Sequence, residues 1–434
     1  LPYLYSSIQI MNIPKTTKPR IVVIGGGFAG ISLLKGLRKE DVQLVLFDKH
    51  NYHTFQPLLY QVSTAGLEPD SIAYPLRKIF RKNKDFHFRL ADVISVAPEA
   101  QEINTSLGKL SYDYLVIATG TKTNFFGNDQ IEKYSMPMKS VPHALNIRSL
   151  MLQNIEKADV TEDDEERKRL LNFVVVGGGP TGVELAGALA EFRKGILGHD
   201  YPELEEEEMH VHLLEGEDKV LAPMSEHASK KSQEYLERLG VQLHLNTMLE
   251  SYDGSKAITK NGETFHTETL IWAAGVTGNP IGGINGEAFL EKINRYKVDP
   301  CNKILGFDRI YALGDIALME TEAFPKGHPQ VAQPAIQQGK HLAKNFKRLL
   351  KNKEMQPFSY FDKGTMATIG RNKAVVDIKK WHFAGAFAWF VWMFIHLWFL
   401  VGFRNRVITF FNWTYSYINY DRAARLIIRP YKKT

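Results

Sequence analysis

The sequence predicts an α/β fold made of two doubly wound, parallel-sheet domains, followed by a C-terminal helical segment. Three observations support this prediction. Residues 20–48 read as a buried strand, a glycine turn, a helix and a second strand. Residues 171–215 repeat that order about 150 residues later, which indicates a second domain of the same kind. After residue 380 the composition becomes aromatic and basic, which marks a separate segment.

The first repeat unit carries the pattern G-x-G-x-x-G at Gly25, Gly27 and Gly30, and its second strand ends at Asp48. In this pattern the first glycine makes a tight turn, the second lets the backbone approach a pyrophosphate, and the third lets helix pack on strand. The pyrophosphate lies on the amide groups at the start of the helix. Asp48 could then accept hydrogen bonds from ribose hydroxyls. The alternative is an ordinary strand–helix corner without a ligand, but the context favours a dinucleotide site.

The second repeat unit has the same pattern at Gly177, Gly179 and Gly182, with Glu215 as the acidic residue. An insertion over residues 193–209 lengthens the spacing to the second strand. The carboxylate of Glu215 would repel the 2′-phosphate of NADP, so this site favours NADH. Two such sites imply two dinucleotides, one held and one exchanged.

Further strand and helix signals lie around these units. Apolar runs at 110–121, 268–276 and 308–317 read as buried strands that end near a glycine, and residues 365–378 alternate as short strands do. The charged run at 161–170 reads as a solvated helix face.

The chain's net charge of +6 is concentrated at its end. Residues 371–434 contain eleven Lys and Arg against two acidic residues, a local charge of +9 that leaves −3 on the first 370 residues. This distribution predicts an anionic membrane surface as a partner, and no nucleic acid. The single cysteine, Cys301, permits no intrachain disulfide, redox cysteine pair or thiolate metal site, so no metal is expected. The first ten residues do not read as a signal peptide.

The layout resembles the glutathione-reductase-like flavoproteins with two Rossmann-like dinucleotide-binding domains. The resemblance is carried by GGGFAG at 25–30, ATG at 118–120 and LGD at 313–315. It implies FAD at the first site, with Thr119, Gly120 and Asp315 also binding it. It further implies the following division of the chain: a first FAD-binding part over 19–125, an NADH-binding domain over 126–280 with its core at 171–276, a second FAD-binding part over 281–378, and membrane-associating helices over 379–434.

Within that group the chain is similar to the type II NADH:quinone oxidoreductases, through residues 51–67, 177–191, 332–339 and 387–406. The resemblance implies that Gln333 and Gln337, which share a helix face, line a quinone pocket near the flavin. Capping or bridging of turns is the alternative role for these glutamines. Glu184 matches the acid near the nicotinamide, although a first-turn Glu that complements the helix dipole would also fit. Lys379 and Lys380 lie where the family has a polar approach to the quinone, and either of the two could supply it.

The last segment predicts attachment to a membrane. Residues 381–403 lack Lys, Arg, Asp and Glu over 23 positions, long enough for a helix to cross a bilayer, yet four tryptophans favour the interface. Downstream, a predicted apolar face (Val407, Phe410, Phe411, Tyr417, Ile418) opposes a polar one (Thr409, Asn412, Ser416, Asn419), with Arg404, Arg406, Arg422, Arg425 and Arg429 around them. A dimer interface or a core helix is the alternative, and a homodimer is compatible with lipid binding.

The expected activity is therefore transfer of a hydride from NADH to FAD and of two electrons to membrane ubiquinone or menaquinone, without proton pumping. The enzyme is expected on the cytoplasmic face of a bacterial membrane. Two other functions stay open: a reductase for a soluble electron-transfer protein or oxygen, which needs no lipid-seeking tail, and a non-enzymatic NADH sensor.

Overall fold

The computed structural model describes residues 11–419 and 424–432, and these residues form two compact units. Unit 1 comprises residues 11–53, 74–122 and 276–362. Unit 2 comprises residues 54–73, 123–275, 363–419 and 424–432. The chain therefore passes from one unit to the other several times.

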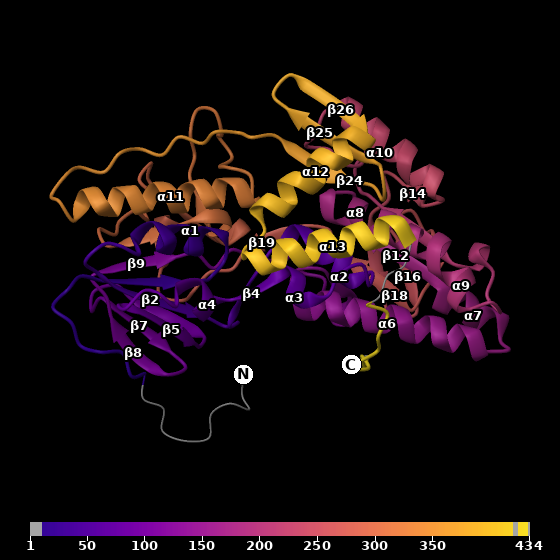
Figure 1. Cartoon of the computed structure of the whole chain (residues 1–434), viewed down its shortest axis with the longest axis horizontal. Coiled ribbons are helices and arrows are strands. Elements are labelled where there is room, and N and C mark those ends of the chain that lie inside the picture. Colours follow the sequence, from indigo (N-terminus) through magenta and orange to yellow (C-terminus); the bar gives the residue numbers. More distant parts are fainter. Residues whose placement is uncertain (1–10, 420–423, 433–434) are drawn as a thin grey trace. The chain divides into compact units, whose positions relative to one another are not determined.

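Unit 1 is built on a five-stranded parallel sheet. Its strands, in spatial order, are β22 (Ile310–Ala312), β9 (Tyr114–Ile117), β1 (Arg20–Ile24), β2 (Gln43–Asp48) and β5 (Phe86–Leu90). Around it lie α1 (Phe28–Leu37), α4 (Leu76–Phe80), α11 (Ala332–Leu349) and the antiparallel strands β6 (Val93–Ala97), β7 (Glu102–Thr105) and β8 (Gly108–Ser111) (Figure 1). The strands are apolar on both faces, as expected for a parallel sheet with covered faces.

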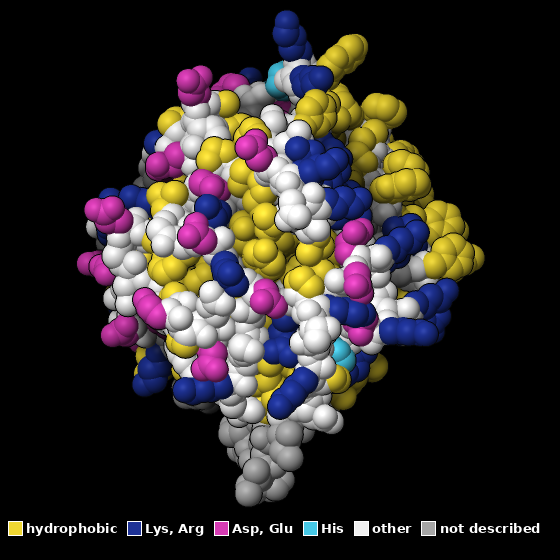
Figure 2. Space-filling model, turned by 90° about the vertical axis from the view of Figure 1, so that its left-hand side faces the viewer, with side chains coloured by type: hydrophobic (Ala, Val, Ile, Leu, Met, Phe, Trp, Pro, Cys, Tyr) yellow, Lys and Arg dark blue, Asp and Glu magenta, His cyan; other side chains and the backbone are white. Residues whose placement is uncertain are grey.

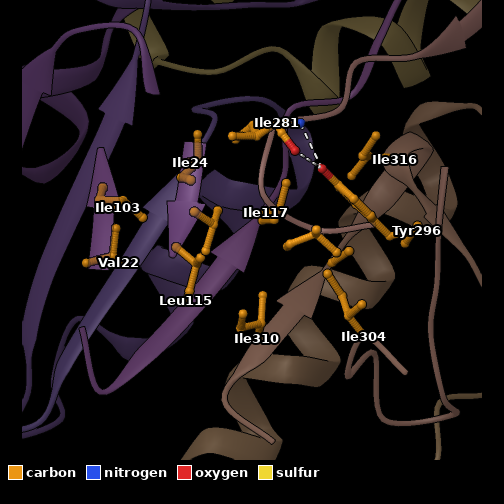
Figure 3. Packing of buried hydrophobic residues seen from close by; sticks show 14 of the residues in the cluster. Val22, Ile24, Ile103, Leu115, Ile117, Ile281, Tyr296, Ile304, Ile310 and Ile316 are labelled. Atoms are coloured by element: carbon orange, nitrogen blue, oxygen red, sulfur yellow. Dashed lines mark hydrogen bonds between the residues drawn. The ribbon is translucent and has the colours of Figure 1, made fainter. Parts of the chain in front are cut away.

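The core of unit 1 joins residues that lie far apart in the sequence. Figure 3 shows Val22 and Ile117 of the sheet packed with Ile281, Ile304 and other buried side chains. The hydroxyl of Tyr296 accepts a hydrogen bond from the amide of Ile281 (2.8 Å) and donates one to its carbonyl (2.7 Å). Residues after 276 therefore return to complete the domain that residue 20 begins.

Unit 2 contains a second parallel sheet of the same kind. Its strands, in spatial order, are β11 (Met136–Pro137), β18 (Thr269–Trp272), β12 (Asn172–Val176), β13 (His210–Leu214) and β14 (Gln242–His244). Its helices include α2 (Leu59–Ser63), α3 (Pro69–Ile72), α5 (Asp129–Tyr134), α6 (Val141–Val160), α7 (Asp164–Leu171), α8 (Pro180–Phe192) and α10 (Glu226–Leu239). Helix α7 exposes Asp164, Glu165 and Lys168 while Leu170 and Leu171 are buried, so the charged run at 161–170 supplies a solvated helix face, as predicted.

The C-terminal part of unit 2 begins with an antiparallel sheet of β24 (Thr365–Thr368), β25 (Ala374–Ile378) and β26 (Trp381–Gly385). Helices α12 (Ala386–Phe399) and α13 (Phe403–Asn419) follow, in yellow in Figure 1. Residues 381–403 are therefore not one helix, because β26 pairs with β25 and the chain turns between α12 and α13. Among the described residues, none of the helices combines the length and the apolar character that a bilayer span requires.

The compact units depart from the expected ranges by a few residues near 125 and 280, and by more in two places. Residues 54–73 belong to unit 2, although they lie within the expected range 19–125. The expected boundary at 378/379 falls between β25 and β26, which are hydrogen-bonded neighbours, so the C-terminal part begins earlier, at residue 363. Backbone pairing of strands is a long-range property that the local composition did not reveal.

Candidate functional site

The glycine turn of unit 1 has the geometry of a phosphate cradle. Gly25 has φ +106°, and a Cβ there would lie 2.3 Å from the carbonyl oxygen of Ala118. A Cβ on Gly30 would lie 2.0 Å from the carbonyl oxygen of Gly25. A Cβ on Gly27, by contrast, would meet no described atom within 4 Å, and no described side chain caps α1. The start of α1 is therefore open, with amide groups that suit a phosphate.

Asp48 closes this cradle. Its carboxylate accepts hydrogen bonds from the amides of Gly26 (2.6 Å) and His50 (2.7 Å). Burial raises the pKa of Asp48, and these two amides partly offset the rise. The strand end therefore places a carboxylate beside the turn, as the sequence predicted.

His53 lies beside the same turn, although the glycine motif does not include it. Its Nδ1 lies 3.0 Å from the carbonyl oxygen of Gly26, which requires that Nδ1 donates. Burial lowers the pKa of His53 to about 4, so the ring is neutral, and its Nε2 is buried without a hydrogen-bond partner among the described residues. The bond to Gly26 indicates that His53 supports the cradle.

The turn of unit 2 repeats this construction closely. Gly177 has φ +110°, and a Cβ on Gly182 would lie 1.8 Å from the carbonyl oxygen of Gly177. A Cβ on Gly179 would meet no atom of the described chain within 4 Å. Glu215 accepts hydrogen bonds from the amides of Gly178 and Glu217, the latter at 2.8 Å. In both units, then, a glycine turn is held by a carboxylate from the end of the neighbouring strand.

Thr119, Gly120 and Asp315 all lie in unit 1, after strands of its sheet. Gly120 has φ +65°, and a Cβ there would meet no described atom within 4 Å. The Oγ1 of Thr119 is buried without a hydrogen-bond partner among the described residues. The hydroxyl of Thr121 donates to Asp315 (3.3 Å). A further residue, Gln338, was not predicted: its side-chain carbonyl accepts from the amide of Gly314 (2.7 Å) and so fixes the turn that carries Asp315.

Gln333 and Gln337 lie one turn apart on α11, as predicted, but their surroundings differ. The Oε1 of Gln333 is buried and has no hydrogen-bond partner in the described part of the chain. The amide group of Gln337 donates to the carbonyl of Phe361 (2.9 Å) and accepts from its amide (3.1 Å). Gln337 thus bridges two chain segments, which is the alternative role given above. Gln333 is therefore the better candidate to contact a bound ligand.

Glu184 lies in the second turn of α8, in unit 2, and not in the first turn. The side chain is buried, which raises its pKa to about 8, while the amide of Thr368 and the indole of Trp392 partly offset the rise. The helix-dipole role is therefore wrong, because that role needs an ionised first-turn carboxylate. Glu184 instead holds a proton at neutral pH.

A cavity of about 380 Å³ lies within unit 2. Its walls come from the α2 region, the end of α8, the β24–β25 turn and helices α12 and α13. The lining combines aromatic residues, among them Tyr60, Trp392 and Trp413, with polar and charged ones, among them Gln61, Glu191 and Arg371. A cavity of this size and lining suits a ring compound with a few polar atoms.

Helices α12 and α13 expose large hydrophobic side chains, most of them aromatic. On α12 these include Phe390, Phe394 and Trp398, and on α13 Phe403, Phe410, Phe411 and Ile418. Figure 2 shows hydrophobic side chains standing out along the upper right edge of this view, with Lys and Arg beside them. The polar Asn405 and Thr409 are buried instead, the reverse of a helix that faces water. Of the predicted arginines, Arg422 lies outside the described residues.

Comparison with known proteins decides the family. Residues 19–339 match the pyridine nucleotide-disulphide oxidoreductase family, and residues 363–419 match the NDH2 C-terminal domain. The type II NADH:quinone oxidoreductase NdhA of Mycobacterium tuberculosis is 36% identical, over 94% of this chain and 89% of the relative. The chain belongs to the type II NADH:quinone oxidoreductases. A second such enzyme of that organism, Ndh, is 34% identical over 94% of this chain and 90% of its own length.

Solved structures agree with this type II NADH:quinone oxidoreductase fold. NDH2 from Plasmodium falciparum, in complex with NADH, matches with a TM-score of 0.86 at 22% identity, over 95% of this chain and all of that one. The sulfide:quinone oxidoreductase of Aquifex aeolicus matches with a TM-score of 0.71 at 20% identity, over 89% and 92%. At these identities the likeness shows the fold. It confirms the predicted two-domain flavoprotein architecture.

Proposed function

We propose that this enzyme transfers a hydride from NADH to bound FAD and then two electrons to membrane quinone, without pumping protons. The observation that carries the proposal is the pair of matching glycine cradles in a chain of this family. Each cradle offers helix amides at an open helix start and a carboxylate, the groups that hold a dinucleotide. FAD and NADH supply the hydride and electron chemistry, and the protein supplies binding and orientation.

The residues of unit 1 are proposed to hold FAD. The open start of α1 at Gly27 would take the pyrophosphate, and Asp48 the ribose. Asp315, on a turn fixed by Gln338, would bind further along the cofactor. Gln333 offers a buried amide oxygen that no described residue hydrogen-bonds, and we assign it to the quinone side of the flavin.

The residues of unit 2 are proposed to bind NADH at Gly179 and Glu215. Glu184 would hold a proton at its carboxyl at neutral pH, and so keeps a negative charge away from the nicotinamide. The cavity walled by Tyr60, Trp392 and Trp413 is proposed to admit the quinone, either ubiquinone or menaquinone. Its aromatic walls suit a flat ring, and Gln61 offers a polar contact.

We expect the flavin absorbance of the purified enzyme to bleach when NADH is added without oxygen, because the hydride passes to the flavin. Addition of a short-chain ubiquinone should restore the absorbance. Bleaching that only a soluble electron-transfer protein or oxygen reverses would favour that rival function. Absence of bleaching would favour the other alternative, a non-enzymatic NADH sensor.

We propose that α12 and α13 attach the enzyme peripherally to an anionic membrane, on the cytoplasmic face of a bacterium, where NADH is available. Exposed aromatic side chains with nearby cations support this, since such a surface binds an anionic interface. Pairing of two copies through the same helices is the alternative, which sedimentation of the protein without lipid would reveal.

Replacement of three exposed aromatics, Phe394, Phe410 and Phe411, by serine should lower binding to phosphatidylglycerol-containing vesicles at least roughly tenfold, because apolar contact with lipid is lost. Co-flotation with the vesicles measures the binding. Val160→Ser is the matched control, since Val160 is 78% exposed at the end of α6. Equal flotation of the triple variant and the control would contradict the attachment.

A further inference from the structure

Helix α13 has two faces with different surroundings. Asn405 and Thr409 are 2% and 0% exposed, whereas Phe403, Phe411 and Ile418 are 80%, 64% and 68% exposed. The exposed face is the one proposed to enter lipid. The buried face therefore packs against another part of unit 2.

The buried face contacts residues 54–73, the segment that contains α2 and α3. The side-chain amide of Asn405 donates to the carbonyl oxygens of Asp70 (2.8 Å), Ser71 (3.1 Å) and Ala73 (3.1 Å). Carbonyls at the end of a helix lack partners within that helix. Asn405 thus caps the end of α3 from a distant part of the chain, inside a buried contact.

Two turns further along α13, the indole of Trp413 donates to the side-chain carbonyl of Gln61 (2.7 Å). Both residues line the cavity of unit 2. An ion pair between Arg404 and Asp70 (3.2 Å) also links the helix to this segment, but its side chains are 58% and 63% exposed, so it contributes little. Asn405 and Trp413 therefore carry the link between the helix and the segment.

Helix α13 thus has an exposed aromatic face, is hydrogen-bonded to residues 54–73 and forms part of the cavity wall. We propose that Asn405 and Trp413 are positioning residues: when α13 settles into an anionic bilayer, they hold residues 54–73 so that the cavity takes the shape that binds quinone. This role rests on the proposed function, since it takes lipid as the cover of α13 and the cavity as the quinone site.

Two variants, Asn405→Ala and Trp413→Phe, are compared with the wild type to test this role. Thr414→Ala is the matched control, because the exposed hydroxyl of Thr414 donates to the carbonyl of Phe410 within its own helix. For each protein, NADH:ubiquinone kinetics with a short-chain ubiquinone are measured with and without vesicles of phosphatidylcholine and phosphatidylglycerol. Vesicle flotation and flavin bleaching by NADH are measured in parallel.

For the wild type and Thr414→Ala we expect vesicles to lower the KM for quinone by roughly tenfold, with kcat changed little. Asn405→Ala and Trp413→Phe should float and bleach as the wild type does, yet keep a high KM with vesicles present. A purely structural role would instead reduce bleaching and kcat together. If Asn405→Ala does not fold, the positioning role is tested with Trp413→Phe alone, because this variant keeps an aromatic ring and removes the N–H donor.

Two outcomes would overturn the positioning role. One is a wild-type response to vesicles in both variants. The other is a wild type that floats with vesicles but has the same KM for quinone with and without them. That result would leave the proposed membrane attachment intact. A wild type that bleaches but never reduces quinone would instead overturn the proposed function itself, so the two failures are distinguishable.

Discussion

Gly30→Ala is expected to yield a protein that purifies without flavin. The new Cβ would lie 2.0 Å from the carbonyl oxygen of Gly25, and a backbone atom cannot rotate away as a side chain can. The start of α1 would have to move, which costs about 3 kcal/mol and distorts the cradle. The ratio of flavin to protein absorbance should fall at least roughly tenfold.

Two further alanine variants, at open positions, tell the two cradles apart. A Cβ on Gly27 or on Gly179 meets no described protein atom within 4 Å, so both variants should fold normally. Gly27→Ala should lose flavin, because the methyl group fills the phosphate space of unit 1. Gly179→Ala should keep flavin but no longer bleach with NADH. If Gly27→Ala kept its flavin and Gly179→Ala lost it, the assignment of the two cradles would be reversed.

Glu184→Gln is expected to stabilise the enzyme at alkaline pH. The folded protein keeps a proton on Glu184 up to about pH 8, because burial raises its pKa, whereas an ordinary glutamate loses the proton near pH 4.5. Between these values folding takes up a proton, so the stability of the wild type falls as pH rises through this window. The glutamine variant lacks this titration. The difference in unfolding free energy should grow in its favour by roughly 1 kcal/mol per pH unit.

Urea unfolding of both proteins at pH 5 and pH 8 measures this difference. Glu237→Gln, at an exposed position of α10, controls for the loss of one negative charge. Stability curves of the wild type and Glu184→Gln that stay parallel from pH 5 to 8 would contradict a protonated Glu184.

The two cradles could be predicted from the sequence because each is local. Gly25, Gly30 and Asp48 lie within one strand–turn–helix–strand unit, and the steric demands of a turn act on neighbouring residues. The same holds for Gly177, Gly182 and Glu215. In each unit the structure places the three residues together as predicted.

Other features depend on contacts between residues far apart in the sequence. Residues 381–385 open the long aromatic run and precede a helix, so nothing local shows that they pair with β25. Gln333 and Gln337 look alike in the sequence, and only the position of Phe361 separates their roles. The bonds of Asn405 reach across more than 330 residues to the end of α3. Such tertiary contacts leave no periodic or compositional signal.

The order of strands in unit 1 has a consequence for synthesis of the protein. Strand β1 starts at Arg20, but β22, at the far edge of the same sheet, starts at Ile310. A growing polypeptide therefore cannot close the first sheet until the ribosome has made all of β11 to β18. Chains with such distant pairings fold slowly. The half-built sheet, with the edge of β9 unpaired, is thus the stage at which nascent chains of this enzyme would most need a chaperone.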